Sequence, residues 1–225
     1  MSENGAARLD QGRPLPYFNA MRAPALAFTL LVATFAMGCS NSDEGNGVPH
    51  YPPGPYGTKN GDVLTNFAFT GLVNETAAEK TKDASWTESY SVGSLLKTDT
   101  RYAFIHLSVI GDAPSEAAAD DLVAEAAELQ GEGAQTIEVL STAEGAPATE
   151  SELRAWVTAH QMSVTAVVDS EDSPLTVFDA LDGAPESGFI IKIPGMTIEW
   201  RAHSADPKAT TVADGIHWLH SLLEE

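Results

Sequence analysis

The sequence predicts an α/β domain with a central mixed sheet flanked by helices. Residues 102–110 form an uninterrupted apolar, β-rich run, which is typical of a central strand buried on both faces. Strand-like and helix-like segments alternate after it, which favours parallel βαβ units with helices on both faces of the sheet. Residues 189–193 and 196–200 flank a turn at Pro194-Gly195, so we expect an antiparallel hairpin near the end of the chain.

From residue 102 onward, the expected elements follow the order β-α-β-α-β-α-β-β-α. Period-two or continuous apolar patterns predict the strands, at residues 64–69, 90–92, 102–110, 136–140, 164–168, 189–193 and 196–200. Apolar residues spaced by three and four predict the helices, at residues 118–129, 149–160, 174–180 and 211–223. Gly131 and Gly133 are expected to end the first helix, because glycine readily adopts the left-handed conformation found after a helix end.

Residues 21–39 have the layout of a secretory signal peptide. Arg22 supplies the positive start, an apolar stretch follows, and small residues precede Cys39, the only cysteine of the chain. The ending Ala36-Met37-Gly38-Cys39 resembles a bacterial lipobox, with Ala36 where leucine is usual, which implies a lipid-modified Cys39. The apolar stretch is shorter than the roughly 20 residues that span a bilayer. An uncleaved anchor and ordinary secretion are the alternatives.

These features divide the chain into three parts. Residues 1–38 are expected to be the signal peptide, with Met21 as an alternative start. Residues 39–60 contain the lipidated Cys39 and a tether rich in Ser, Asn, Gly and Pro, flexible at first and stiffer in its Pro-rich half. Residues 61–225 are long enough to form one domain with its own core.

The charge balance excludes one class of partner. The chain has 12 Lys and Arg against 32 Asp and Glu, a formal net charge of −20. Such a surface repels phosphate backbones, so we expect no nucleic-acid partner. A single cysteine also excludes a disulfide framework, so the stability of the domain must come from its core.

Four local features carry a family resemblance. They are the entry segment at residues 61–67, the strand at 102–110 that runs directly into a helix, the unit formed by Trp156, His160 and residues 164–169, and Gly183-Ala184-Pro185 before the strand at 189–193. In this order and spacing they resemble the thioredoxin-like fold of the redoxins, the peroxiredoxin-like (AhpC/TSA-type) branch, over residues 60–225. The resemblance implies a mixed sheet flanked by helices and a redoxin-type N-terminal extension.

The resemblance also identifies what is missing. The family's C-x-P-C motif matches Asp112-Ala113-Pro114-Ser115, which keeps the proline and lacks both cysteines. A helix N-terminus stabilises the reactive thiolate of active members, and the same field favours a carboxylate. Disulfide exchange needs a thiolate, so we expect no catalytic residue here. Asp112 is interpreted as a helix N-cap, with a functional carboxylate as the alternative.

Pro185 matches the family's cis-proline. In active relatives the loop before it holds an extended peptide by backbone pairing, a form of strand addition. If Pro185 faces Asp112 in this way, a groove for a protein or peptide partner remains without the thiols. The alternative is an ordinary trans proline in a turn.

No cofactor or metal is expected. His217 and His220 are three residues apart on the last predicted helix and could share a metal, but Trp218 and Leu219 beside them favour a packing helix. His106 lies inside the central run and is interpreted as a hydrogen-bonded core histidine. Residues 169–172 include three carboxylates but lack the spacing of a calcium loop.

The sequence therefore predicts a lipoprotein of the cell envelope, anchored through Cys39, with the outer membrane slightly favoured because Ser40 and not Asp follows the cysteine. Its thioredoxin-like domain is expected to bind or scaffold a partner rather than act as an enzyme. The alternatives are a redoxin-family thiol oxidoreductase or antioxidant protein by descent, with a non-standard active site, and a plain spacer domain.

Overall fold

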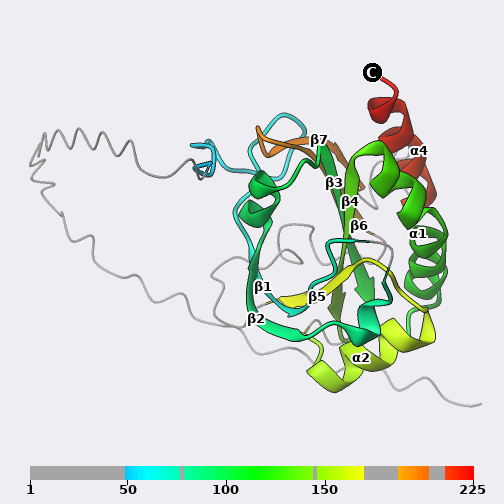
Figure 1. Ribbon diagram of the computed structural model, residues 1–225. Coiled ribbons are helices and arrows are strands. Elements are labelled where there is room, and N and C mark those ends of the chain that lie inside the picture. Colours follow the sequence, from blue (N-terminus) through cyan, green and yellow to red (C-terminus); the bar gives the residue numbers. More distant parts are fainter. Residues whose placement is uncertain (1–48, 77–78, 144–145, 170–186, 203–210) are drawn as a thin grey trace, which may run out of the picture. The chain divides into compact units, whose positions relative to one another are not determined.

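The computed structural model describes residues 49–76, 79–143, 146–169, 187–202 and 211–225 (Figure 1). The segment expected to be a signal peptide, Cys39, the helix expected at 174–180 and Pro185 lie outside the described residues. Within the described part of the chain, no helix is both long and apolar enough to cross a membrane.

In the described part of the chain, seven strands form one sheet in the order β2-β1-β5-β4-β3-β6-β7. Strands β3, β4 and β5 are parallel, whereas β1, β2, β6 and β7 join by antiparallel pairing. The bounds are β1 Ala68–Leu72, β2 Trp86–Ser91, β3 Tyr102–Val109, β4 Ala134–Ser141, β5 Thr165–Asp169, β6 Ser187–Lys192 and β7 Thr197–Arg201. The mixed sheet predicted from the sequence is confirmed.

Three α-helices are described, α1 Ala113–Glu132, α2 Glu150–Ala159 and α4 Val212–Leu223, together with the 3₁₀ helices η1 Thr81–Asp83 and η2 Val92–Lys97. The end of α1 is marked by Gly133, whose φ of 97° lies in the left-handed region. Reciprocal capping boxes start the other two helices. Thr149 pairs with Glu152 at α2, and the hydrogen bonds from the Thr149 backbone and side chain lower the pKa of Glu152. Thr211 pairs with Asp214 at α4.

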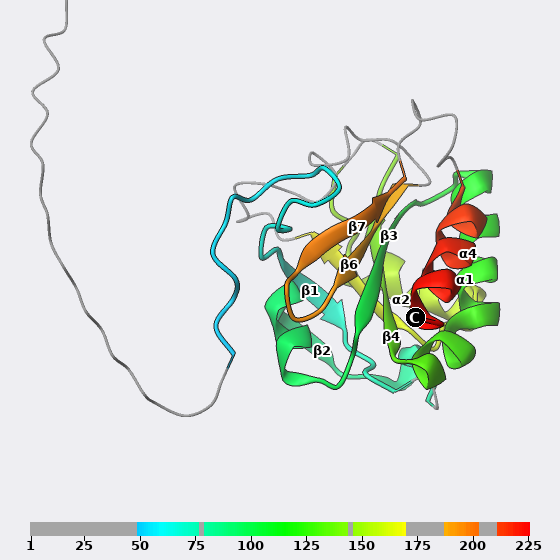
Figure 2. The ribbon, with the colours of Figure 1, turned by 90° about the horizontal axis from the view of Figure 1, so that it is seen from above.

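The two faces of β3 bury different sets of side chains. Tyr102 and Phe104 pack with residues of α1 and α4. Ala103, Ile105 and Leu107 point to the opposite face, because successive side chains of a strand alternate. Figure 2 shows α1 and α4 together on one side of the sheet. Helix α2 packs in a cluster that includes α1 residues, so the three described α-helices cover the same face.

The opposite face is covered by the N-terminal part of the domain and by η2. We expected α-helices on both faces, and the remaining expected helix falls in residues 174–180, outside the described part. The strand expected at 64–69 begins only at Ala68. Leu64 and Phe67 are buried, but Leu64 N–H donates to Met196 of the β6–β7 connection (2.8 Å). The alternating pattern of residues 64–69 therefore reflects buried side chains, and only its last two residues belong to strand β1.

Part of the Pro-rich segment assigned to the tether contacts the domain. The Tyr51 hydroxyl donates to the Leu64 carbonyl (2.6 Å), and the Gly57 N–H donates to the Val63 carbonyl (3.1 Å). Burial raises the pKa of the Tyr51 phenol above its usual range, with a further contribution from Tyr56. Tyr51 therefore stays a hydrogen-bond donor at physiological pH, and the packed structure extends N-terminal to residue 61.

Two glycines test how closely the helices pack. A Cβ atom at Gly215 of α4 would lie 2.9 Å from ring atoms of Phe104 and Trp200, whereas a Cβ at Gly131 of α1 would meet nothing within 4 Å. Overpacking a core costs about 1–3 kcal/mol, and Gly→Ala in an open helix position gains about 0.5–1 kcal/mol. Gly215→Ala should therefore lower the free energy of unfolding in urea, although it improves helix propensity, and Gly131→Ala should raise it. Equal effects at the two sites would contradict the close approach of α4.

Candidate functional site at the N-terminus of helix α1

The first turn of α1 carries a closed set of hydrogen bonds. Asp112 is the N-cap, and its Oδ2 accepts from the Ser115 N–H (3.0 Å) and from the Ser115 hydroxyl (2.8 Å). The same hydroxyl oxygen accepts from the Val109 N–H (3.1 Å) at the end of β3. Ser115 is fully buried. The N-cap predicted for Asp112 is confirmed.

The chain between β3 and α1 places these side chains. The Ile110 N–H donates to Ser141 at the end of β4 (3.0 Å), which continues the parallel pairing for one residue beyond β3. Gly111 then takes a φ of 77°, a conformation that glycine adopts without a steric penalty. This turn brings Asp112 over the first turn of α1, and Ala113 and Pro114 stay exposed.

The arrangement has a limited chemistry. Both the hydrogen and an acceptor site of the Ser115 hydroxyl are used within the cap, and among the described residues no base other than the Asp112 carboxylate contacts it. The only sulfur of a cysteine in the whole chain is at residue 39. A thiolate is required for disulfide exchange, so this helix start cannot perform it.

A second polar cluster lies inside the sheet. His106 of β3 and Glu138 of β4 are register partners, both fully buried, with Nδ1 and Oε2 2.7 Å apart. The core histidine predicted at residue 106 is confirmed. Its partner was missed, although a glutamate within the apolar residues 136–140 was a usable signal, since a lone charge is rarely buried without a partner.

This cluster does not form a hydrolase-like triad. The Ser108 hydroxyl lies 3.4 Å from His106 Nδ1, the same nitrogen that faces Glu138. In a catalytic triad, the serine hydroxyl contacts one ring nitrogen of the histidine and the carboxylate contacts the other. His106 Nε2 and Glu138 Oε1 are buried and have no hydrogen-bond partner among the described residues. The cluster is sealed in the core and offers no access to a substrate.

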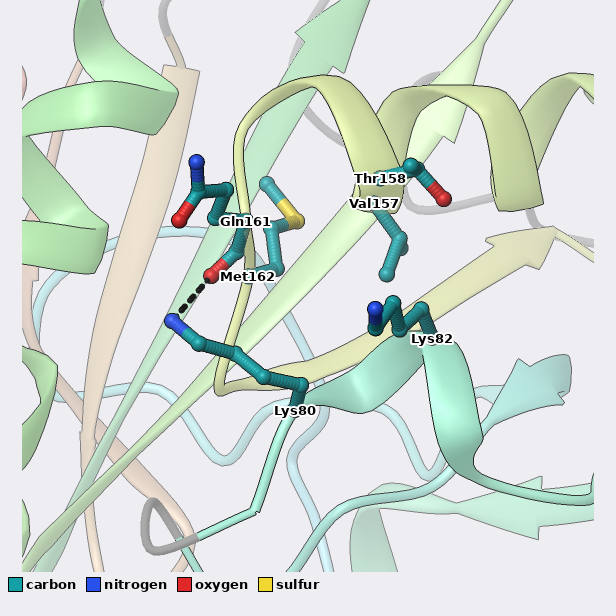
Figure 3. A pocket seen from close by; sticks show the side chains of 6 residues that line it. All are labelled: Lys80, Lys82, Val157, Thr158, Gln161 and Met162. Atoms are coloured by element: carbon teal, nitrogen blue, oxygen red, sulfur yellow. Dashed lines mark hydrogen bonds between the residues drawn. The ribbon is translucent and has the colours of Figure 1, made fainter.

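A cavity of about 340 Å³ lies elsewhere, between η1 and the end of α2 (Figure 3). Lys80, Lys82, Val157, Thr158, Gln161 and Met162 line it. The Lys80 ammonium donates to the Gln161 carbonyl (2.9 Å), just beyond the helix end. A helix C-terminus carries partial negative charge, so this lysine is already engaged there.

The histidines of α4 take separate roles. His217 is exposed, and His220 is half-buried against α1, with its Nδ1 2.9 Å from Glu132. Cys39 and Pro185 lie outside the described residues, so the predicted groove between Asp112 and Pro185 stays a prediction. The two described cis X-Pro bonds precede Pro55 and Pro194.

Comparison with known proteins rests on structure alone, because no family model matches the sequence and no curated protein matches it. A thiol:disulfide interchange protein from Bacteroides sp. is 13% identical over 74% of this chain and 91% of its own, with a TM-score of 0.50. The thioredoxin domain of a thiol-disulfide oxidoreductase from Bacteroides vulgatus is 14% identical over 73% of this chain and 98% of its own, with a TM-score of 0.50. AhpC of Enterococcus faecalis is 12% identical over 72% of this chain and 91% of its own, with a TM-score of 0.51. The chain has a thioredoxin-like fold.

The thioredoxin-like fold confirms the architecture expected from the redoxin resemblance. Sequence identities of 12–14% establish a shared fold only. Asp112 and Ser115 stand at the two positions that the resemblance assigns to the cysteine pair, and the chain lacks that pair. Their side chains touch each other. Two thiols at the same positions would therefore lie within disulfide range, since residues three apart on a helix are neighbours.

This geometry predicts a gain of function. In a Cys39→Ser background, the chain should not reduce insulin above the dithiothreitol background. The double variant Asp112→Cys/Ser115→Cys should do so, because the helix N-terminus favours the thiolate. The single variant Asp112→Cys is the matched control, with one thiol and no means of completing a disulfide cycle. Turnover by the Cys39→Ser chain itself, or none by the double variant, would contradict this account of the site.

Proposed function

We propose that this chain is a membrane-tethered lipoprotein of the cell envelope whose thioredoxin-like domain binds or scaffolds a partner without thiol chemistry. The observation that carries the proposal is the hydrogen-bonded cap of Asp112 and Ser115, which replaces a reactive pair with a structural one. The lipobox-like ending at Cys39 supports the anchor. Cys39 is also the only cysteine of the chain, and it precedes the domain expected at residues 61–225.

The proposed binding surface surrounds the start of α1. Ala113 and Pro114 are exposed there, and the proline ring fixes φ and so presents a rigid apolar surface. A groove continuing toward Pro185 would hold an extended peptide by backbone pairing, as the redoxin resemblance implies. The net charge of −20 favours a neutral or basic partner over an acidic one.

The second candidate is thiol-disulfide oxidoreduction, the activity after which two structurally similar proteins are named. It would require Cys39 to remain a free thiol and to reach the domain from its tether. The lone cysteine would still lack a resolving partner, so this candidate has less support than binding.

Site-specific photo-crosslinking tests the binding role. A photoreactive residue at Ala113 should capture a discrete partner in the cell envelope, because this exposed position adjoins the proposed groove. Ala127 is the matched control, since it is an exposed alanine of the same helix, about four turns further along. Capture that is absent at Ala113, or equal at the two positions, would count against the binding surface.

The mass of the native N-terminus tests the anchor. We expect the chain purified from membranes to begin at Cys39 and to carry acyl groups, since stable anchoring takes more than one chain. Mass spectrometry of the N-terminal peptide, after treatment with iodoacetamide, distinguishes the possibilities. An alkylated Cys39 would show a free thiol, which would refute lipidation and reopen the oxidoreductase candidate. The result is independent of whether Met1 or Met21 starts translation.

A further inference from the structure

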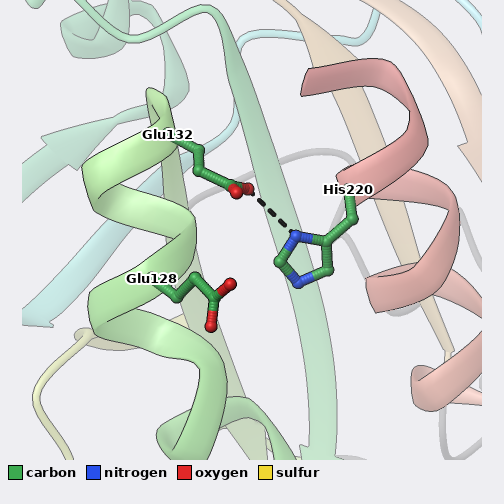
Figure 4. A group of neighbouring side chains, drawn as sticks. All are labelled: Glu128, Glu132 and His220. Atoms are coloured by element: carbon green, nitrogen blue, oxygen red, sulfur yellow. Dashed lines mark hydrogen bonds and ion pairs between the residues drawn. The ribbon is translucent and has the colours of Figure 1, made fainter. Parts of the chain in front are cut away.

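Helices α1 and α4 bring three metal-ligating side chains together. Glu128 and Glu132 are four residues apart on α1, so they lie on the same side of that helix. His220 of α4 faces them, as Figure 4 shows, with its Nδ1 2.9 Å from Glu132 Oε2. One ligand atom from each residue lies within 4.8 Å of the other two.

We propose that Glu128, Glu132 and His220 form a binding site for a divalent transition metal, with Zn²⁺ as the best-suited ion. Zinc takes imidazole nitrogen and carboxylate oxygen at about 2.0–2.2 Å, usually with four ligands. Three protein ligands leave the fourth position to water. The glutamates are exposed and the histidine is half-buried, so the glutamate side chains have room to rotate toward a bound ion.

The histidine separates this site from an ordinary acidic surface. Exposed carboxylates alone attract Ca²⁺ and Mg²⁺, which prefer oxygen ligands. An imidazole nitrogen from a second helix selects transition metals instead. From the sequence, His217 and His220 could share a metal, but a packing helix was favoured. The other two ligands of this site could not be seen within α4, because they come from a helix about 90 residues earlier in the sequence.

The surrounding charges also favour a cation. Glu125 lies on the other side of the ring, 3.8 Å from His220 Nε2, and together with Asp121 it lines a groove of about 370 Å³ beside the cluster. Like charges three and four residues apart on a helix repel each other. The nearby Arg101 guanidinium donates to backbone carbonyls, those of Glu132 (3.0 Å) and Leu223 (2.8 Å). Bound zinc would offset the repulsion and join α1 to α4.

Calorimetric titration tests the site. The full-length chain, without a histidine tag and with Cys39→Ser to exclude the thiol, is stripped of metal and titrated with Zn²⁺ at pH 7.5. We expect one zinc per chain and a rise in Tm on binding, because a ligand of the folded state stabilises it. His220→Gln and Glu132→Gln should each weaken binding at least tenfold and abolish the rise in Tm. Millimolar Ca²⁺ should not displace the zinc.

His160→Gln is the matched control. His160 also pairs with a carboxylate from another element, Asp120 of α1 (2.7 Å), and it belongs to no group of three metal ligands among the described residues. Its loss should leave zinc affinity unchanged. The proposal is overturned if zinc does not bind, if His220→Gln binds as tightly as the unmutated site, if His160→Gln weakens binding equally, or if Ca²⁺ competes.

Discussion

The burial of strand β3 on both faces is the constraint on which the rest of the fold depends. Seven of its eight residues are buried, and it pairs with β4 on one edge and β6 on the other. A strand in this position needs an apolar cover on each side. Helices α1 and α4 supply one cover, and the N-terminal segment with η2 supplies the other. Because β3 is held on all sides, the turn at its end delivers Asp112 to a fixed place.

The same strand contributes His106 to a fully buried pair with Glu138 of β4. His106 Nδ1 and Glu138 Oε2 are 2.7 Å apart. In most buried pairs of this kind, the free energy lost by removing both groups from water exceeds the free energy gained from their attraction. Removing only one partner nevertheless destabilises the protein by about 3–5 kcal/mol, because the other partner is left buried and unpaired. A slip of one residue between β3 and β4 would turn one of these side chains to the opposite face. It would leave both groups buried and unpaired. The pair therefore penalises wrong registers more than it stabilises the right one.

The strongest sequence patterns predicted elements that the structure contains. The run at 102–110 and the helical spacing after it correspond to β3 and α1, and the hairpin at Pro194-Gly195 corresponds to β6 and β7. A local pattern shows which residues are buried, but it does not show which of them pair with a neighbouring strand. The first strand was therefore placed four residues early, at 64 rather than 68. Local patterns also could not pair Glu138 with His106, or His220 with Glu132, because those contacts depend on how separate elements pack.

Helix α1 shows what replaces the thiols. An acidic N-cap stabilises a helix by about 0.5–2 kcal/mol over a residue that cannot cap, and the buried Ser115 hydroxyl ties that cap to the end of β3. A catalytic thiolate has to remain accessible and reactive, which generally costs stability at the site. Asp112 and Ser115 satisfy each other and the backbone, so this helix start forms a rigid junction between β3 and α1. A junction of that kind suits a surface that must keep its shape for a partner, and it requires no sulfur to do so.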